Sequence, residues 1–463
     1  MELRDYQKDA LEDCLNYLKQ KKLKPGIVCA PTSYGKSLLI SSIANEVKEK
    51  VLVLQPSIEL LKQNLNKLHL LGGTADVYSA SLRKKTIGNI TYATLGSIKN
   101  LGKEFKELGI SIVLVDECDN SYSPDPTSIF TKFIGDLSPR AVIGFTATPL
   151  RLKTNSEGSR LNLLTRMRPN YFKHFIHIMQ IQDMIARGYW TPIRYMPFEF
   201  DENKLVVNKM GSEFTEESII NYNKVKGINN KIYLQVKELL ASGVSNILVF
   251  CDSILTAKRL AEYVPNSAAI YGDLPTKVRT KILEDFAEGK IATLFNYQVL
   301  AVGYDNPKLE ALIMGRSTLS FSQYYQIIGR GVRIYPGKKD FLFADYGGNV
   351  QRFGPVENIR FEDVDNYGWG MFSGERLLTN CHLTGAPIYK KDLEAIKVEV
   401  KYPTSDYTIT IGKYKGRKLN QVERSYLEFM IYGSNFDFKV PVMKEFKLVV
   451  EKYLEETKMS TLG

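Results

Sequence analysis

The stretch Gly26–Ser37 (GIVCAPTSYGKS) decides the fold of this chain. Its first part, Gly26–Ala30, is apolar and predicts a strand, and an apolar helical pattern begins at Leu38. The loop between them ends in Gly-Lys-Ser, the pattern of a phosphate-binding loop, whose backbone N–H groups and helix N-terminus hold phosphate oxygens. We expect Lys36 to neutralise the β/γ-phosphates and Ser37 to hold Mg²⁺. The predicted nucleotide-binding loop comprises Thr32, Ser33, Tyr34, Gly35, Lys36 and Ser37.

A second segment supplies the acidic groups that such a site requires. Ile112–Val115 is predicted as a strand and runs directly into Asp116 and Glu117. Two acids at the end of a buried strand are costly unless a cation or a reaction uses them. We expect Asp116 to contact Mg²⁺ and Glu117 to serve as base or orienter for the attacking water.

A third segment, Gln326–Arg333 (QIIGRGVR), lies nearly 300 residues after the loop. Arg330 and Arg333 are three residues apart, so they share roughly one face if the segment is helical. Guanidinium groups stabilise the charge that develops on a transferring phosphoryl group. If Arg330 and Arg333 reach the nucleotide, the site lies between two domains and nucleotide turnover opens and closes the cleft.

Strand and helix patterns alternate twice along the chain, which indicates parallel α/β sheets covered by helices. The first set of predicted strands is Gly26–Ala30, Val51–Gln55, Ile112–Val115 and Ala141–Phe145. The second set is Asn246–Phe250, Ala268–Tyr271, Ile291–Phe295 and Ala311–Met314. The last 113 residues lack this alternation, and we expect strands there at Val398–Val400 and Tyr407–Ile411 and helices at Glu423–Tyr432 and Met443–Glu456.

Composition narrows the class of protein further. The chain has 463 residues, 44% of them hydrophobic and 24% charged, which favours globular domains over disorder or a coiled coil. No apolar run reaches the roughly 18–20 residues that span a bilayer. The five cysteines form no C-x-x-C pair, which argues against a zinc site or disulfide framework and suits a reducing cytosol. The net charge of +11 permits a polyanionic partner without requiring one.

Part of the positive charge is concentrated in residues 151–173, where aromatic residues follow closely. Basic residues among aromatics suit a phosphate backbone with stacked bases. The alternative is a solvated linker whose aromatics pack on a neighbouring domain, and composition does not separate the two. Candidate nucleic-acid contacts in this stretch are Arg166, Arg168 and Lys173.

Taken together, the three segments and their neighbours resemble superfamily 2 nucleic-acid helicases and translocases over residues 1–350. Leu3–Gln7 (LRDYQ) is similar to the family's adenine-reading segment, which implies base contacts by Arg4 and Gln7, with Tyr6 stacking or packing nearby. Asp116–Asp119 (DECD) resembles the family's acidic box and Gln326–Arg333 its arginine motif. Thr146–Pro149 (TATP) resembles the motif that couples ATP state to strand movement. The resemblance therefore implies coupling roles for Asp119, Thr146 and Thr148.

Other segments resemble the family's nucleic-acid motifs. Leu54–Ser57 with Leu60 and Gln63 is similar to a backbone-contacting segment, and Thr91–Thr94 to a second one. Gly303–Pro307 resembles the G-x-D-x-P motif beside the arginines, which contacts ribose or phosphate. The implied nucleic-acid contacts are Pro56, Ser57, Gln63, Thr91 and Thr94, and the implied nucleotide contacts in the second domain are Gly303 and Asp305.

The resemblance implies two RecA-like parallel-sheet motor domains in tandem, of α/β class, followed by a small α+β domain. We expect the first RecA-like domain at 1–152, a basic and aromatic linker at 153–190, the second RecA-like domain at 191–350 and a C-terminal accessory domain at 351–463. The implied ligands are ATP and Mg²⁺.

Gln182–Trp190 followed by Pro192 is similar to the entry of the second domain in DNA-directed members, including phage recombination helicases of the UvsW type and restriction translocases. This favours DNA over RNA, and forked or branched DNA as the substrate of unwinding, branch migration or fork remodelling. An RNA helicase, a double-strand DNA translocase in a restriction or repair complex, and a non-hydrolysing clamp remain alternatives. The expected location is the cytoplasm of a bacterium or virus-infected cell, without a membrane partner.

The C-terminal region contains one further signal, Ile411–Leu419 (IGKYKGRKL), which resembles a small module appended to some nucleases and other DNA-acting proteins. Its cations suit phosphate contacts, with Tyr414 available to stack. The alternative is an exposed hairpin with ordinary lysines. The candidate contacts are Lys413, Lys415 and Arg417.

Overall fold

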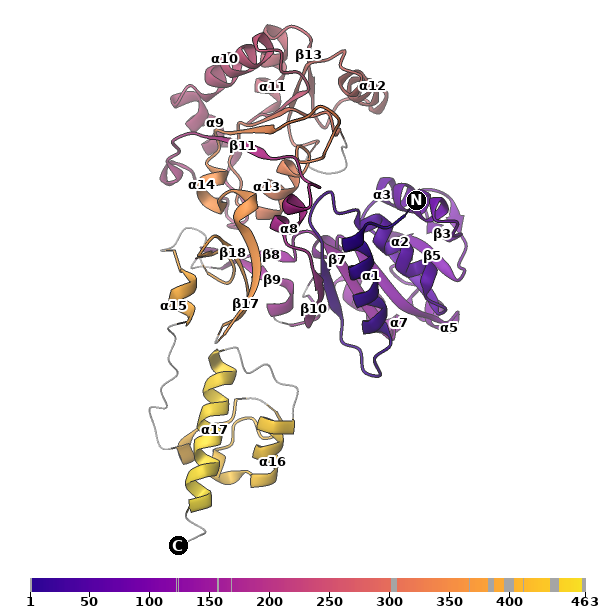
Figure 1. Ribbon diagram of the computed structural model, residues 1–463, viewed down its shortest axis with the longest axis vertical. Helices are drawn as coiled ribbons and strands as arrows, with labels where there is room; N and C mark the ends of the chain where they lie inside the picture. The colour runs from indigo at the N-terminus through magenta and orange to yellow at the C-terminus, as the bar shows by residue number, and fades with distance from the viewer. Residues whose placement is uncertain are drawn as a thin grey trace. The chain divides into compact units, whose positions relative to one another are not determined.

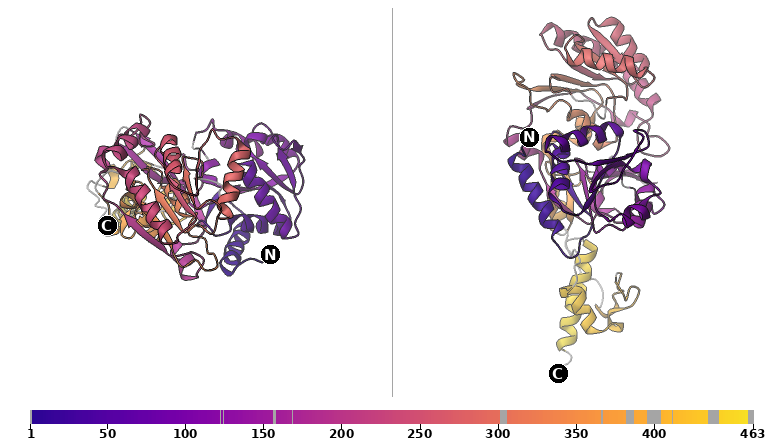
Figure 2. Two further views of the ribbon diagram at one scale, coloured as in Figure 1. Left: turned by 90° about the horizontal axis from the view of Figure 1, so that it is seen from above. Right: turned by 90° about the vertical axis from the view of Figure 1, so that its right-hand side faces the viewer.

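The apolar segments predicted as strands form two separate sheets, each with helices on both faces (Figures 1 and 2). The computed structural model describes residues 2–121, 123, 125–155, 158–167, 169–300, 306–365, 367–381, 387–394, 404–410, 412–433 and 441–459. The chain divides into two compact units, one of residues 1–359 with 382–384 and one of residues 360–381 with 385–463. Within the described residues, no helix is both long and apolar enough to cross a membrane.

The first sheet has eight strands in the order β10-β1-β7-β6-β2-β5-β3-β4, all parallel except the short β4. Its strands are β1 (Gly26–Cys29), β2 (Lys50–Gln55), β3 (Asp76–Ser79), β4 (Lys84–Lys85), β5 (Ile90–Thr94), β6 (Ile110–Asp116), β7 (Ala141–Thr146) and β10 (His174–Ile178). Successive side chains of a strand point to opposite faces. Both faces of β1, β2, β6 and β7 are buried, which explains their unbroken apolar sequence.

Two helical layers cover this sheet. One contains α1 (Asp5–Leu18), α2 (Lys36–Glu46) and α3 (Ile58–Leu70), which pack side by side (Figure 1). The other contains α5 (Gly102–Glu107) and α7 (Ile129–Leu137), whose Phe105 and Phe133 are buried against the sheet. The carboxyl ends of β1, β6 and β7 therefore meet at one edge, where a ligand of an open α/β sheet is expected.

The second sheet is parallel and has six strands in the order β11-β16-β15-β12-β14-β13. They are β11 (Ile193–Pro197), β12 (Ile247–Phe250), β13 (Ser267–Ile270), β14 (Thr293–Asn296), β15 (Ala311–Met314) and β16 (Phe341–Asp345). Helices α10 (Ile228–Ala241) and α11 (Ile254–Tyr263) pack on one face. Helix α13 (Phe321–Ile328) packs on the other, where the ring of Tyr324 meets Phe343. Two RecA-like domains in tandem are thus present.

The second unit contains an antiparallel sheet of β17 (Ile359–Val364), β18 (Gly368–Ser373) and β19 (Arg376–Leu377), and a separate helical core. The predicted helices correspond to α16 (Arg424–Glu428), continued by a short π-helical turn, and α17 (Pro441–Met459). The predicted strand Tyr407–Ile411 was wrong, because its described residues form only an isolated bridge from Thr408 to Lys418. Backbone hydrogen bonds link Ile409 to Gly416 and Arg417, and Tyr407 to Leu419, but they do not form a regular strand. The predicted strand Val398–Val400 lies outside the described residues.

Candidate active site

The nucleotide-binding loop joins β1 to α2 at the carboxyl edge of the first sheet. Gly35 adopts φ 89°, and a Cβ atom there would lie 2.5 Å from Nε2 of Gln7. Only glycine fits this position without strain. Ser33 also has a positive φ of 65°, which non-glycine residues seldom adopt. Lys36 and Ser37 open α2, so their side chains and backbone N–H groups stand at the positive end of its helix dipole.

Lys36 and the acidic box form the centre of the site. Nζ of Lys36 lies 2.6 Å from Oε1 of Glu117 across 81 residues of sequence. Burial by itself would lower the pKa of Lys36, but the charges of Glu117 and Asp116 outweigh burial and raise it. Glu117 has φ 43° immediately after β6, a strained conformation of a kind that is concentrated at functional sites.

Asp116 is almost completely buried beside this ion pair. Its Oδ2 accepts a hydrogen bond of 2.9 Å from Nδ2 of Asn64, and its Oδ1 accepts one of 3.0 Å from the backbone N–H of Glu117. Burial, followed by the charge of Glu117, raises the pKa of Asp116 to about 6. A carboxylate this destabilised is poised to accept a cation.

Asp119 connects the acidic box to the next motif. Its Oδ1 accepts a 2.7 Å hydrogen bond from Thr146 Oγ1, and its Oδ2 accepts a 3.2 Å bond from Thr148 Oγ1. All three side chains are buried. The structure thus brings together Asp119, Thr146 and Thr148, the residues to which the sequence assigned coupling roles.

Arg4, Tyr6 and Gln7 lie against the nucleotide-binding loop. Nε2 of Gln7 donates a 2.8 Å hydrogen bond to the carbonyl of Tyr34, and the Tyr6 hydroxyl donates to the same carbonyl at 3.2 Å. The guanidinium of Arg4 lies 4.3 Å from the ring centre of Tyr189. This aromatic and cationic group suits the face and edge of an adenine ring.

The second domain approaches the loop through α13. The hydroxyl of Tyr325 accepts a hydrogen bond of 3.3 Å from the backbone N–H of Thr32, and Nε1 of Trp190 donates one of 3.0 Å to the Thr32 carbonyl. Gly329 allows this approach, because a Cβ atom there would lie 2.6 Å from Thr32 Oγ1. The two domains therefore meet at the phosphate loop.

The predicted arginines follow α13 directly. Burial lowers the pKa of Arg330 to about 10, and the charge of Glu117 opposes that shift, so Arg330 lies within electrostatic range of the acidic box. Burial also lowers the pKa of Arg333, and Gln326 is half-buried on α13. Gly303 and Asp305 lie outside the described residues.

Buried polar atoms that lack a hydrogen-bond partner indicate whether a nucleotide and a cation would fit this site. Ser33 Oγ, Asn64 Oδ1 and Glu117 Oε2 are in this state at the site, and other described side chains elsewhere in the chain share it. An unsatisfied buried group costs about 1–3 kcal/mol, so such atoms are rare in native proteins. All three belong to the loop or to the surroundings of Asp116, which fits phosphate groups and a hard cation as ligands.

The predicted nucleic-acid contacts divide into two groups. Pro56 and Ser57 follow β2 and Thr94 ends β5, so these three lie toward the carboxyl edge, and Gln63 is exposed on α3. Thr91 does not join them, because it is fully buried and its hydroxyl is hydrogen-bonded to Gly88.

The structure distinguishes between the two alternatives that composition left open for the basic and aromatic stretch. Phe172 is fully buried in the core of the first domain, with Tyr171 and Phe175 packed beside it. Lys173 lies at the opposite edge of the sheet, where its N–H donates to the Pro25 carbonyl. Arg166 is half-buried in a short 3-10 helix, and Arg168 lies outside the described residues. The aromatic residues are therefore part of the first domain's core, the alternative that composition had left open.

Four contributors to the site escaped the sequence analysis as site residues: Asn64, Tyr189, Trp190 and Tyr325. Asn64 had a usable signal, because it shares the buried face of α3 with Leu61 and Leu68. A polar residue on an apolar helical stripe predicts a buried polar partner. The three aromatic residues had none, since their contacts join distant parts of the chain.

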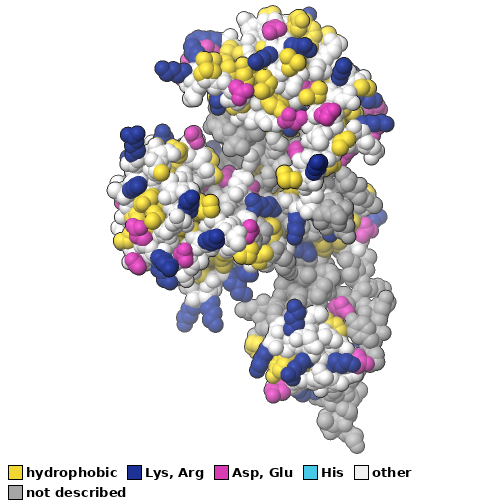
Figure 3. Space-filling view, turned by 180° about the vertical axis from the view of Figure 1, so that it is seen from behind, with side chains coloured by type: hydrophobic (Ala, Val, Ile, Leu, Met, Phe, Trp, Pro, Cys, Tyr) yellow, Lys and Arg dark blue, Asp and Glu magenta, His cyan; other side chains and the backbone are white. Residues whose placement is uncertain are grey.

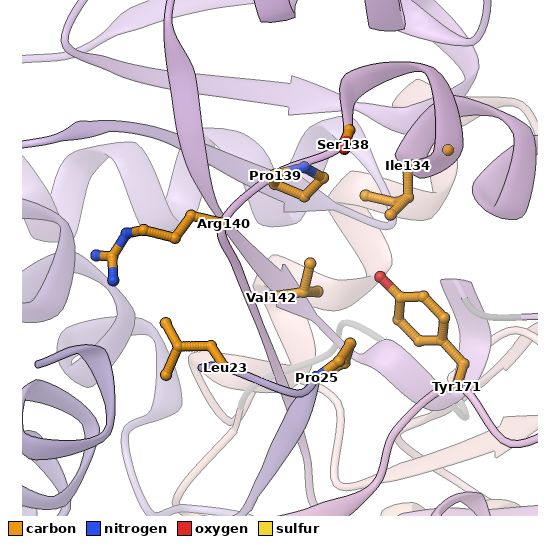
Figure 4. A pocket seen from close by; sticks show the side chains of 9 residues that line it. Leu23, Pro25, Ile134, Ser138, Pro139, Arg140, Val142 and Tyr171 are labelled. Carbon is orange, nitrogen blue, oxygen red and sulfur yellow. The ribbon is translucent and has the colours of Figure 1, made fainter. Parts of the chain in front are cut away.

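A pocket with a volume of about 230 Å³ lies away from this site (Figure 4). It lies at the amino ends of β1 and β7, between Pro25, Pro139 and Tyr171. Arg140 lines the pocket, and its guanidinium group donates hydrogen bonds to the Leu18 carbonyl and to Glu49. Because the phosphate loop is at the other edge of the sheet, this pocket is separate from the nucleotide site.

Family models match both domains. Residues 1–151 match the model of the type III restriction enzyme res subunit, and residues 230–335 match the helicase conserved C-terminal domain. These are the two domains of a superfamily 2 helicase. The phosphate loop and the acidic box lie within the first matched range, and the arginine segment lies within the second.

Two curated relatives, both distant and longer, illustrate the similarity. A Schizosaccharomyces pombe protein named as a mitochondrial ATP-dependent helicase, irc3, is 25% identical over 370 residues, covering 76% of this chain and 58% of that protein. A Haloarcula marismortui protein named as a DNA 3'-5' helicase, Rad25, is 24% identical over 359 residues, covering 76% and 54%. The chain thus spans a little over half the length of these curated relatives.

A solved structure shares the fold. The fragment structure named as a HsdR subunit of a type I restriction enzyme from Vibrio vulnificus YJ016 superposes with a TM-score of 0.56 at 20% identity. The superposition covers 76% of this chain and 65% of that one.

Proposed function

We propose that the chain is an ATP-driven DNA helicase or translocase that acts on forked or branched DNA. The observation that carries the proposal is the composite ATP site. It contains the buried Lys36–Glu117 pair and Asp116 on the first domain and Arg330 within range of Glu117 on the second. Such a site is complete only when both domains meet, so hydrolysis would drive relative domain movement. Because β10 (His174–Ile178) is a strand of the first sheet, the first motor domain extends beyond the expected limit of 152, and we propose 191–350 as the limits of the second.

The chemistry follows from the groups present. In the described state Lys36 neutralises Glu117; bound phosphate would compete for the Lys36 ammonium and free Glu117 to accept a proton from the attacking water. Arg330 and Arg333 would stabilise charge on the transferring phosphoryl group. Ser37 and Asp116 would hold Mg²⁺, which supplies neutralisation of phosphate charge. Arg4, Tyr6 and Gln7 would orient the adenine.

DNA as the substrate is supported by the segment Gln182–Trp190 and by the name of the Rad25 relative as a DNA helicase, whereas two other relatives are named as RNA helicases. Charge alone does not mark a path, because Lys and Arg are dispersed among Asp and Glu on the face in Figure 3. The C-terminal loop offers one local site, since Lys413, Lys415 and Arg417 are all exposed. Tyr414 packs edge-on against Tyr426, and Lys413 and Arg417 lie 5.2 and 5.6 Å from its ring centre. Tyr414 is therefore better placed to hold cations outward than to stack on bases.

The test is ATP hydrolysis by the full chain with single-stranded, duplex, forked and four-way DNA, and with duplex RNA. We expect the greatest stimulation with forked or four-way DNA and strand displacement on a fork. Lys36→Ala should abolish hydrolysis while DNA binding persists. Preferential stimulation by RNA would favour an RNA helicase. Stimulation by duplex without strand displacement would favour a double-strand translocase.

A further inference from the structure

A two-stranded ribbon, separate from both large sheets, follows the coupling motif. Strands β8 (Leu150–Asn155) and β9 (Gly158–Leu163) pair antiparallel, and the ribbon begins immediately after Pro149. Leu152 faces Leu161, and Lys153 faces Arg160. Because side chains alternate along a strand, one ribbon face is apolar near its base and the other is basic.

The apolar face of the ribbon rests on the second domain. Leu152 packs against the buried cluster of Phe214, Ile219 and Leu319. Nearer the tip, Thr154 Oγ1 donates a 3.0 Å hydrogen bond to the carbonyl of Gly211, and Ser159 Oγ donates to the same carbonyl. The ribbon thus follows directly from the last motif of the first domain and packs against the second.

Both ends of this connection lead to the ATP site. At the base, Thr146 and Thr148 hydrogen-bond to Asp119 of the acidic box. At the far side, Leu319 is followed by Ser320, whose hydroxyl caps α13 by accepting from the Gln323 N–H. Helix α13 leads into Arg330. The ribbon therefore joins the acidic box to the arginine segment by covalent bonds and buried contacts.

The other face of the ribbon carries Arg151, Lys153 and Arg160, with Asn162 opposite Arg151. Lys153 is exposed, and Arg151 and Arg160 are half-exposed. In the sequence of residues 150–163, Glu157 is the only Asp or Glu. Residues two apart on a strand are roughly 6.8 Å apart, about twice the 3.4 Å rise per nucleotide of a DNA strand. Arg151 and Lys153 have this spacing, and Arg160 lies directly across the ribbon from Lys153, so the three cations form a compact group that suits a phosphodiester backbone.

We propose that the basic face of the β8–β9 ribbon binds the phosphodiester backbone of a DNA strand, and that strand binding is transmitted through this ribbon to the ATP site. The proposal deepens the proposed function, on which it rests. The partner is a nucleic acid because three cations on one flat ribbon face match a repeating anion.

The first test replaces the charges in the full chain by Arg151→Gln, Lys153→Gln and Arg160→Gln. The matched control is Lys19→Gln, Lys21→Gln and Lys22→Gln, which removes three exposed cations from the opposite edge of the same domain. Binding of a fluorescent forked DNA is measured by anisotropy from 50 to 200 mM salt. Each lost phosphate contact lowers the slope of log K against log salt by about 0.7–0.9, so we expect a decrease of about 2–3 for the ribbon variant. A decrease equal to that of the control would overturn the proposal.

The second test addresses transmission with Gly211→Ala. Gly211 has φ 64°, and an added Cβ would lie 2.0 Å from Cγ2 of Thr154, so the ribbon tip must move. We expect DNA-stimulated hydrolysis to fall at least fivefold while DNA affinity falls less than in the charge variant. Stimulation equal to that of the unaltered chain would exclude transmission through the ribbon. If no DNA stimulates the unaltered chain, the proposed function fails, and the anisotropy arm still decides whether the ribbon binds DNA.

Discussion

Ser33 occupies a position that usually favours glycine. A left-handed conformation costs a non-glycine residue about 1–2 kcal/mol, and the buried Ser33 hydroxyl also lacks a hydrogen-bond partner. We expect Ser33→Gly to raise the free energy of unfolding by about 0.5–1 kcal/mol, as measured by urea denaturation without nucleotide. Ser33→Ala is the control, because it removes the hydroxyl but keeps the Cβ atom. If both variants change stability equally, backbone strain at this position is negligible.

Asp116 gives the chain a stability that depends on pH. Because burial raises its pKa to about 6 in the folded state, the folded chain keeps a proton that the unfolded chain releases near pH 4. The contribution of Asp116 to stability is therefore complete below about pH 4 and is lost as pH rises through about 6. Without Mg²⁺, we expect this residue to lower the free energy of unfolding by on the order of 2 kcal/mol across that window.

The measurement for Asp116 is denaturation at several pH values between 4 and 7 in EDTA, compared with Asp116→Asn. The difference between the two chains should change with pH in that window. Adding Mg²⁺ at pH 7 should stabilise the unaltered chain more than the variant, because the carboxylate is a ligand and the amide is a weaker one. A pH-independent difference would contradict the raised pKa.

At the scale of elements, α13 delivers Arg330 to the site on the first domain. Its Tyr325 and the close approach of Gly329 fix the helix against Thr32. We expect Arg330→Ala to lower kcat for ATP hydrolysis about a thousandfold, the magnitude typical of an arginine that stabilises phosphoryl transfer. Binding of a fluorescent ATP analogue should change less than threefold. The exposed Arg194 provides the matched control as Arg194→Ala. A large loss of ATP binding with little loss of kcat would place Arg330 in ground-state binding instead.

At the scale of the whole molecule, all described residues of the ATP site belong to the unit of residues 1–359, and the second unit has its own core around Leu427 and Phe446. We expect a chain of residues 1–359 to fold, as checked by circular dichroism, and to retain kcat within about threefold. Its DNA affinity should fall, and Lys413→Gln, Lys415→Gln and Arg417→Gln in the full chain should reproduce most of that fall. A folded but inactive 1–359 chain would show that the second unit contributes to catalysis.

The sequence predicted the local parts of this protein well. The nucleotide-binding loop, the strand before it and the acidic segment after β6 depend on neighbouring residues, so their spacing is visible in one dimension. The prediction of a strand at Tyr407–Ile411 was wrong because β propensity does not indicate whether a partner strand is long enough to pair. The aromatics at 171–175 were ambiguous because a stacking surface and a buried core have the same composition.

The sequence by itself thus determined two α/β domains and which residues surround a nucleotide's phosphates. Only the tertiary structure showed that Asn64 holds Asp116, that Trp190 and Tyr325 hold Thr32, and that the β8–β9 ribbon rests on Phe214 and Leu319. The physical reason is the range of the contacts. Periodicity and motif spacing report interactions between residues close in sequence. Thr32 and Tyr325 are 293 positions apart and meet only because α13 of the second domain packs against the phosphate loop of the first.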